Sequence, residues 1–394
     1  MATKTNMEVK GNKYFRITTD IGIDANGKRI RKQFTGKTKK EAEAKRDAYL
    51  EKAKAGLIDN KKIYLGKTMK TWLYEVVKVG QIKPSSFSRY AGIYSKYFEK
   101  SPLANMSLDK IKPLDIQRYY NSLKENGKSS NVILNANKLL KQFFNYCIDN
   151  GYMLVNPCIG KKIIIPKDNI ENKKRIEDKE LPVFSTDEMK KILNQKEDTK
   201  IRYLALFSYA TGMRRGEILA LKEDDIDYKN KEIYIRRTLV TTYIYDNEGN
   251  KHKETFIDDT KTYSSIRDIP LPDDLIPIIK KIISLKKKDM LKAGECFNKE
   301  NQDFLFLTDT GEYIEASNID KSWIYFLKRC GIEHKKFHAL RHTYATLQFE
   351  AGKPLITISK LLGHASIDVT SSTYTHVLKK EKQKAISTLS LLNS

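Results

Sequence analysis

Cysteine is scarce in this sequence. Four occur among 394 residues, at positions 147, 158, 296 and 330, with no CxxC pair and no tight cluster with histidine. Neither a disulfide framework nor a zinc site is therefore expected. Long apolar runs are also missing, and the first twenty residues are polar, so the sequence predicts neither a membrane-spanning helix nor a signal peptide. We expect a soluble, cytoplasmic protein.

Acidic residues are in deficit. The chain has 49 Asp and Glu against 73 Lys and Arg, a formal net charge of +24, and 19 of these charges lie in the first 165 residues. This excess indicates a polyanionic partner. Solvated lysines that favour solubility are an alternative explanation. Two adjacent basic segments beside a near-neutral C-terminal half are more typical of modules that clamp DNA. The length favours two or three domains, and 40% hydrophobic residues exclude global disorder.

Residues 1–64 predict a small sheet followed by a helix. Segments 13–21 and 28–34 alternate partly in polarity, and the Asp-Ala-Asn-Gly sequence between them is typical of a hairpin turn. Thr38 with Glu41 is a capping-box signature for the helix. The hairpin exposes four basic residues: Lys28, Arg29, Arg31 and Lys32. They suit a β-ribbon in a DNA groove, although basic residues on an edge strand also discourage aggregation.

Residues 65–165 predict an all-α domain. Apolar residues recur at helical spacing in four stretches: 69–77, 85–98, 114–123 and 131–148. Their aromatic side chains are expected to form a core rather than to stack on bases. Asn156 and Pro157 and the polar run that follows break this pattern, and we place a linker at 166–182.

Residues 183–394 predict a mainly helical domain with a small antiparallel sheet. Ser185 and the acidic residues after it are typical of a helix start. Segments 231–245 and 255–271 are rich in β-branched and aromatic residues around an Asn-Glu-Gly-Asn turn, so we expect them to pair in one sheet. Helical spacing returns after residue 274. The predicted fold class is therefore multidomain α+β.

Four motifs in the last segment are unusual together: Thr-Gly-Met-Arg-Arg-Gly-Glu from 211, Thr-Lys-Thr-Tyr-Ser-Ser-Ile-Arg-Asp-Ile-Pro from 260, His-Ala-Leu-Arg-His-Thr from 338, and Leu-Leu-Gly-His from 361 with Tyr374 ten residues after its histidine. Taken singly, Arg214 is typical of a surface residue beyond a helix end, and Lys261 of an ordinary hairpin lysine. His338 and Arg341 are three residues apart and share a helix face.

These motifs resemble the boxes of the tyrosine recombinase (phage integrase) family, whose order Arg, Lys, His-x-x-Arg, His, Tyr is complete here. The three-part layout resembles integrases of the Tn916-like conjugative transposon branch. The resemblance implies an arm-type DNA-binding domain with a three-stranded sheet at 1–64, a core-binding domain at 65–165 and a catalytic domain at 183–394. The tail from Lys379, apolar at helical spacing, either packs on its own domain or docks on a neighbouring protomer.

By this resemblance, Tyr374 is the nucleophile that forms a 3′-phosphotyrosyl link. Arg214 and Arg341 bind the nonbridging phosphate oxygens, whose negative charge grows in the pentacoordinate transition state. Glu217 orients Arg214. Because a free tyrosine has a pKa near 10, we expect a cationic pocket to favour ionisation of Tyr374.

The resemblance makes His338 and His364 further donors to the phosphate, and His338 also a candidate acceptor of the phenolic proton. Lys261 is the candidate acid for the leaving 5′ oxygen. The motif does not select the neighbouring residues Arg215, His342 and His376. Metal chemistry needs clustered carboxylates, and the pairs Asp224 with Asp225 and Asp258 with Asp259 are expected to be solvated. We expect no metal, cofactor or ATP.

The resemblance implies a site-specific recombinase that excises and integrates a transposon or prophage in the bacterial cytoplasm, associated with the nucleoid. Expected partners are double-stranded DNA at element ends, core, arm and target sites, and further copies of the chain in a tetramer. An excisionase and a host DNA-bending protein are candidate accessory partners. A type IB topoisomerase and a catalytically silent DNA-binding protein are the alternative functions.

Overall fold

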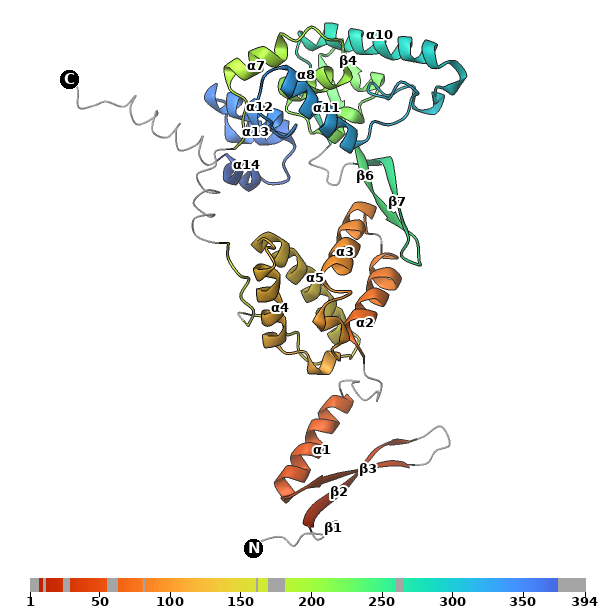
Figure 1. Ribbon diagram of the computed structural model, residues 1–394, viewed down its shortest axis with the longest axis vertical. Helices are drawn as coiled ribbons and strands as arrows, with labels where there is room; N and C mark the ends of the chain where they lie inside the picture. The colour runs from red at the N-terminus through yellow and green to blue at the C-terminus, as the bar shows by residue number, and fades with distance from the viewer. Residues whose placement is uncertain are drawn as a thin grey trace, which may run out of the picture. The chain divides into compact units, whose positions relative to one another are not determined.

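The computed structural model describes residues 7–9, 12–23, 29–54, 63–80, 82–160, 162–168, 181–259 and 266–374. The chain divides into two compact units, Met1–Asn169 and Ile170–Ser394 (Figure 1). Some predicted features lie outside the described residues: Lys28, Lys261, His376, most of the 166–182 linker, and the tail from Lys379.

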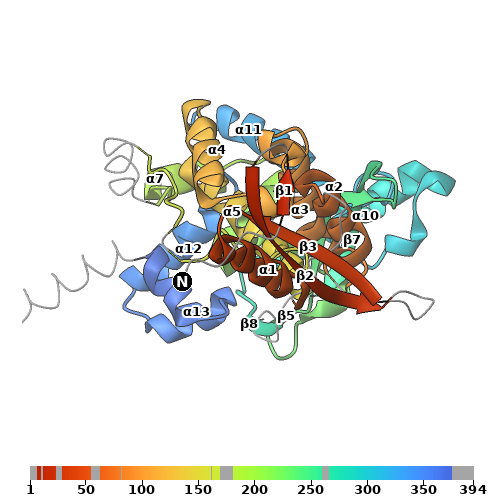
Figure 2. The same ribbon diagram turned by 90° about the horizontal axis from the view of Figure 1, so that it is seen from below.

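The N-terminal part is a three-stranded antiparallel sheet with one helix on its face. Strands β1 (Met7–Val9), β2 (Asn12–Ile23) and β3 (Arg29–Gly36) follow this order across the sheet. Helix α1 (Lys39–Lys54) packs against β2 and β3 (Figure 2). Its Tyr49 ring lies 5.2 Å from the buried Phe34 ring. Glu41 N donates to Thr38 Oγ1 over 3.2 Å, which confirms the predicted helix start.

The remainder of the first unit is helical, as predicted. Its helices are α2 (Leu65–Thr71), α3 (Pro84–Tyr97), α4 (Pro113–Glu125) and α5 (Ser130–Asp149), with a π-helical continuation of α2 at Trp72–Val77 and 3₁₀ turns at Pro102–Asn105 and Leu108–Lys110. The aromatic residues predicted as core are buried or half-buried: Tyr90, Tyr94, Phe98, Tyr119, Phe143, Phe144 and Tyr146. The 3.6-residue periodicity predicted these helices because each buries one apolar face.

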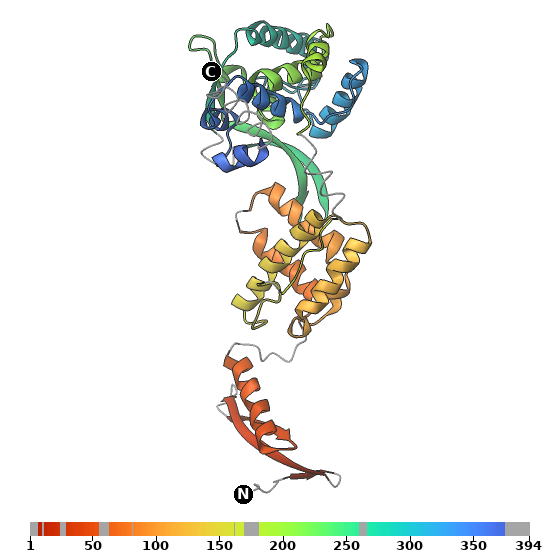
Figure 3. The same cartoon turned by 90° about the vertical axis from the view of Figure 1, so that its left-hand side faces the viewer.

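The second unit contains two small sheets rather than the single predicted one. Strands β4 (Ile226–Asp227), β5 (Glu232–Ile235) and β8 (Arg267–Pro270) form an antiparallel sheet in the order β4-β5-β8. Strands β6 (Arg237–Tyr245) and β7 (Lys251–Asp259) pair separately as a hairpin that projects from the helices (Figure 3). The division follows burial: Ile233, Ile235 and Ile269 of the first sheet lie in the core, whereas the hairpin is mostly half-buried or exposed.

Helices form most of the rest of the described part of this unit. They are α7 (Thr186–Leu193), α8 (Lys200–Thr211), α9 (Arg215–Leu219), α10 (Leu275–Ala293), α11 (Ala316–Arg329), α12 (Ala339–Glu350), α13 (Leu355–Leu362) and α14 (Ile367–Thr373), with 3₁₀ turns at Glu223–Asp225, Gly294–Cys296 and Lys299–Asn301. Helix α8 is central and contacts α10, α11 and α12. Ser185 and Glu188 form the capping box predicted at the start of α7. Over the described ranges, no helix is both long and apolar enough to cross a membrane.

Candidate active site

Two helices of the second unit end at glycines in the left-handed conformation. Helix α8 ends at Gly212, with φ +66°, and α13 ends at Gly363, with φ +63°. A Cβ atom would lie 2.4 Å from the Tyr344 ring at the first position and 2.7 Å from Arg267 Nη1 at the second. Only glycine therefore fits both the backbone and the space. These two helix ends supply the backbone carbonyl groups on which the site is built.

Arg341, in the first turn of α12, is held by both helix ends. Its side chain donates from Nη1 to Gly212 O over 2.7 Å and from Nη2 to Leu362 O over 2.6 Å. The residue is only 2% exposed. Burial first, and then the charge of Arg214, lower the pKa of Arg341 to about 9, so the guanidinium remains positive at neutral pH. Carbonyls at helix C-termini stabilise such a desolvated cation.

Arg214, the N-cap of α9, is oriented by a buried carboxylate. Its Nη1 lies 2.7 Å from Glu217 Oε1, and its Nη2 donates to Gly363 O over 2.9 Å. Glu217 is 3% exposed and also receives Arg267 Nη2 over 2.8 Å. The Nε of Arg267 donates to Leu361 O over 2.8 Å. The geometry supports the orienting role predicted for Glu217, and two arginines share this carboxylate.

Sequence reasoning missed Arg267. It lies six residues after Lys261, within the same motif, as the first residue of β8. The signal that could have revealed it was an arginine at the start of a short strand whose Ile269 lies in the core. Arg215, by contrast, turns away from the site, because its Nη1 pairs with Asp320 Oδ1 at 2.5 Å. The structure therefore separates the two adjacent arginines, and Arg214 is the one that meets the helix ends.

A Glu217→Gln variant is expected to have a lower free energy of unfolding than wild type at neutral pH but not in acid. Burial raises the pKa of Glu217, but hydrogen bonding and charge from Arg267, and the charge of Arg214, outweigh it and lower the pKa from 4.5 to about 2. A carboxyl with a depressed folded-state pKa stabilises the fold above its unfolded value, and this contribution disappears as the pH falls through the folded value. The shift corresponds to about 3 kcal/mol.

The measurement is the free energy of unfolding in denaturant as a function of pH, followed by Trp323 fluorescence in a Trp72→Phe background, since the chain has only these two tryptophans. Wild type is expected to exceed the Glu217→Gln variant by about 3 kcal/mol at neutral pH. The difference should close between pH 4.5 and about 2. A difference independent of pH would show that the two arginines do not stabilise the ionised carboxylate.

Two histidines lie beside the arginines. His338 is the N-cap of α12 and is exposed, yet desolvation of its ring by surrounding protein atoms, followed by the charges of His342, Arg341 and other neighbours, lowers its pKa to about 4. His364 directly follows the left-handed Gly363, and its Nδ1 lies 2.7 Å from Thr370 Oγ1. Burial and then the charges of nearby arginines lower its pKa to about 4 as well. Both rings are therefore neutral at neutral pH.

Tyr374 caps the C-terminal end of α14 and is buried, with 1% exposure. Its ring packs against Phe349, with ring centroids 5.4 Å apart. Burial raises the pKa of the phenol to about 12, although the charge of Arg341 acts in the opposite direction. The expectation that the pocket favours ionisation was therefore wrong for this arrangement, because desolvation outweighs the cationic neighbour.

Sequence reasoning also passed over His342. Its Nδ1 lies 3.0 Å from Tyr374 Oη, and its ring centroid lies 4.8 Å from that of His338. The side chain follows Arg341 directly in the chain, so the same turn of α12 presents both groups. The only signal in the sequence was a second histidine in the His-Ala-Leu-Arg-His-Thr motif. Lys261 and His376 lie outside the described residues.

The basic residues of the N-terminal hairpin separate into different environments. Lys32 Nζ lies 4.0 Å from the centroid of the Tyr49 ring, so it faces α1. The exposed Arg31, the next residue in the strand, belongs to the opposite face, where its Nε lies 3.1 Å from Asp20 Oδ1. Lys28 and the side chain of Arg29 lie outside the described part of the chain. Of the two described candidates, Arg31 is therefore the one exposed on the face of the sheet away from α1.

The acidic pairs do not behave alike. Asp224 is exposed, as predicted, but Asp225 is buried and pairs with Arg237 Nη2 at 2.5 Å. The expectation of a solvated Asp225 was wrong because its arginine partner lies twelve residues away on β6. Asp258 is half-buried and only the backbone of Asp259 is described. Within the described ranges, no group of three or more His, Cys, Asp or Glu side chains is arranged to hold a metal ion.

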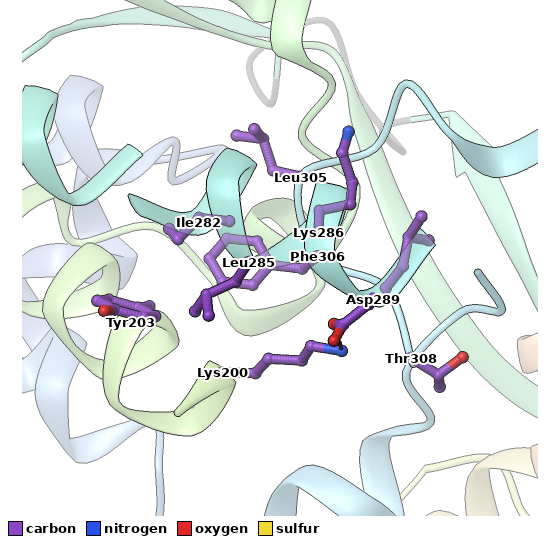
Figure 4. A pocket seen from close by; sticks show the side chains of 10 residues that line it. Lys200, Tyr203, Ile282, Leu285, Lys286, Asp289, Leu305, Phe306 and Thr308 are labelled. Atoms are coloured by element: carbon purple, nitrogen blue, oxygen red, sulfur yellow. Dashed lines mark ion pairs between the residues drawn. The ribbon is translucent and has the colours of Figure 1, made fainter. Parts of the chain in front are cut away.

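A separate hollow lies near the other end of α8. It is lined by Lys200, Ile282, Asp289 and Phe306, among others, and contains an ion pair of 2.9 Å between Lys200 Nζ and Asp289 Oδ2 (Figure 4). Lys200 begins α8, whereas Gly212 ends it, so the two ends of the helix lie about 18 Å apart, with the hollow near one end and the arginine cluster near the other. Of the predicted catalytic residues whose positions are described, none lines this hollow.

Comparison with known proteins identifies the sequence relatives. Residues 182–381 match the phage integrase family, and residues 64–124 match the N-terminal SAM-like domain of phage integrases. The chain is 45% identical to a tyrosine recombinase XerC-like protein of Caldanaerobacter subterraneus subsp. tengcongensis over 99% of both chains. It is 31% identical to the integrase of Staphylococcus phage L54a, over 72% of this chain and 81% of that one. The transposase of transposon Tn916 from Enterococcus faecalis is 25% identical, over 73% and 71%.

Solved structures resemble the fold. A Tn1549 transposon integrase in complex with a circular intermediate DNA matches with a TM-score of 0.62 and 19% identity, over 81% of this chain and 99% of that one. A lambda integrase tetramer bound to a Holliday junction matches with a TM-score of 0.53 and 18% identity, over 89% and 90%. At these identities, the structural likeness concerns the fold.

Proposed function

Because the chain belongs to the phage integrase family of tyrosine recombinases, we propose that it excises and integrates a mobile genetic element by site-specific cleavage and rejoining of DNA. The observation that carries the proposal is the pair of arginines, Arg214 and Arg341, held on the carbonyls of two helix ends, with the charge of Arg341 acting on Tyr374. The three-part layout and the similarity to the Tn916 transposase favour the Tn916-like branch.

The proposed reaction is a transesterification. The Tyr374 oxygen attacks the phosphorus, and the 5′ oxygen leaves with a proton from Lys261. The 3′-phosphotyrosyl link that forms conserves the energy of the broken phosphodiester bond for rejoining. Arg214 and Arg341 bind the nonbridging oxygens where negative charge develops, and His338 and His364 add hydrogen bonds to them. Neutral histidines suit this role, since a neutral ring still donates from one nitrogen.

The proposed layout assigns arm-site DNA to residues 1–64, core-site DNA to residues 65–165 and catalysis to residues 183–394. The Tn1549 and lambda integrases were solved in complex with DNA, and lambda integrase as a dimer and a tetramer, which supports a DNA-bound tetramer here. We place the protein in the bacterial cytoplasm at the nucleoid, with an excisionase and a host DNA-bending protein as accessory partners. A topoisomerase would need neither the N-terminal sheet and helix nor synapsis.

An Arg31→Gln variant is expected to bind arm-site DNA more weakly than wild type and to lower the slope of log affinity against log salt by about 1, as one lost phosphate contact requires. Lys32→Gln is the matched control, because its ammonium group lies over the Tyr49 ring and faces α1. Fluorescence anisotropy at several salt concentrations measures both slopes. Equal losses of DNA affinity in the Arg31→Gln and Lys32→Gln variants would contradict the proposal that the exposed face of the sheet binds DNA.

The experiment that tests the function uses a supercoiled plasmid that carries both ends of the element as direct repeats. The proposal predicts two smaller circles from this plasmid and no reaction on a plasmid without the ends. Sequence-independent relaxation without exchange would identify a topoisomerase. Retarded mobility of the DNA on a native gel, with neither product, would identify a silent DNA-binding protein.

A further inference from the structure

The Tyr374 hydroxyl has a partner that the mechanism above does not use. Its Oη lies 3.0 Å from His342 Nδ1, with ring centroids 5.9 Å apart and planes inclined by 63°. Desolvation, followed by the charge of Arg341, lowers the pKa of His342 below its ordinary value of 6.5. The ring is therefore neutral at neutral pH, and a neutral imidazole whose Nδ1 is unprotonated accepts the hydrogen bond of the phenol.

The burial of Tyr374 favours a mechanism that uses such an acceptor. With its pKa raised to about 12, only about one phenol in 10⁵ is ionised at pH 7. If only the phenolate attacked, the cleavage rate would be reduced by this ionised fraction. Transfer of the proton during the attack avoids the loss, provided that a base lies within hydrogen-bond distance of the oxygen.

We propose that His342 is a catalytic residue that takes the phenolic proton as Tyr374 attacks DNA, an inference that rests on the function proposed above. The Oη–H bond breaks and the proton moves to Nδ1, while the Oη–P bond forms. The P–O5′ bond breaks, and the 5′ oxygen takes its proton from Lys261. In rejoining, the 5′ hydroxyl attacks the phosphorus and gives its proton back to Lys261. The O5′–P bond forms as the P–Oη bond breaks, and His342 returns its proton to the departing phenolate.

The charges around His342 suit a group that holds the proton only briefly. Among the described residues, the titratable or charged groups that act on its ring are His338 and Arg341 from the start of α12 and Tyr374 from the end of α14. The positive charge of Arg341 destabilises the imidazolium, so the proton remains available for rejoining. His338, the acceptor suggested by the sequence, contacts the His342 ring, whereas His342 itself forms the hydrogen bond to the phenol.

The test compares wild type with His342→Ala and His342→Asn. Asparagine places an amide oxygen near the position of Nδ1, so it preserves a hydrogen-bond acceptor but takes up no proton at neutral pH. Single-turnover cleavage of DNA nicked beside the cleavage position is expected to slow about 100-fold in both variants, with DNA binding unchanged. Rejoining from isolated adduct should slow by the same factor. His334→Asn, which alters an exposed histidine outside the site, should cleave like wild type.

A second readout separates proton transfer from positioning. Replacement of Tyr374 by 3-fluorotyrosine, a more acidic phenol, should accelerate cleavage by the His342→Asn variant more than by wild type. Cleavage by His342→Asn within about twofold of wild type, or a fluorotyrosine effect equal in both proteins, would overturn the role as a base. A wild-type protein that forms no adduct at all would overturn the proposed function itself and this step with it.

Discussion

A Tyr374→Phe variant binds its DNA sites and forms no covalent adduct; this is the largest effect that we expect from a single substitution. The change removes one oxygen and leaves the ring packed against Phe349. Loss of the hydrogen bond to His342 costs about 1 kcal/mol of stability, so the protein remains folded. Phenylalanine offers no nucleophile, and cleavage should fall below detection.

The measurement pairs a denaturing gel, which reports the adduct, with a native gel, which reports binding. Tyr344→Phe is the matched control, because this tyrosine packs against the same cluster but is not the predicted nucleophile. It should form the adduct normally. An adduct that persists in the Tyr374→Phe variant would show that another residue attacks the DNA.

An Arg341→Ala variant is expected to lose both catalysis and stability. The substitution removes donors from Gly212 O and Leu362 O and empties a fully buried site, which should cost about 3 kcal/mol of unfolding free energy. Loss of a buried positive charge at the proposed phosphate site should slow cleavage by about 10²–10³-fold. Arg341→Lys retains a charge but not hydrogen bonds in two directions, so its cleavage rate should be intermediate.

Single-turnover cleavage and denaturant unfolding separate the two effects. Arg215→Lys is the control, since this arginine pairs with Asp320 at the surface and should change the unfolding free energy by less than about 1 kcal/mol. An Arg341→Ala protein that cleaves at the wild-type rate would remove Arg341 from the mechanism. Equal losses of cleavage rate in the Arg341→Ala and Arg215→Lys variants would show that the motif does not distinguish a catalytic arginine from a surface arginine.

Local patterns in the sequence predicted most of the fold. The helix from Ser130 buries apolar residues at a spacing of 3.6, and Ser185 with Glu188 forms the expected capping box. Such signals lie within a few residues of one another and need no knowledge of the tertiary structure. The predicted single sheet is two sheets because only part of each predicted strand segment reaches the core. The alternation of polar and apolar residues does not reveal which part is buried.

The candidate site also depends on tertiary contacts that local sequence patterns do not reveal. The motif order predicted the arginines and the tyrosine as site residues, but His342 reaches Tyr374 across 32 positions and Arg267 reaches Glu217 across 50. Neither pairing follows from spacing. The raised pKa of Tyr374 also depended on tertiary burial, since the sequence showed only the cationic neighbours.

The central claim is that Tyr374 becomes bonded to a DNA 3′ phosphate without a metal ion. Trypsin cuts after Lys360 and Lys379 and releases a peptide in which Tyr374 is the only tyrosine. The direct measurement is mass spectrometry of this peptide from adduct trapped on nicked DNA in EDTA and then digested with nuclease. The account predicts a nucleotide 3′ phosphate on Tyr374, whereas a nucleotide on another residue, or an adduct that forms only when metal is added, would contradict it.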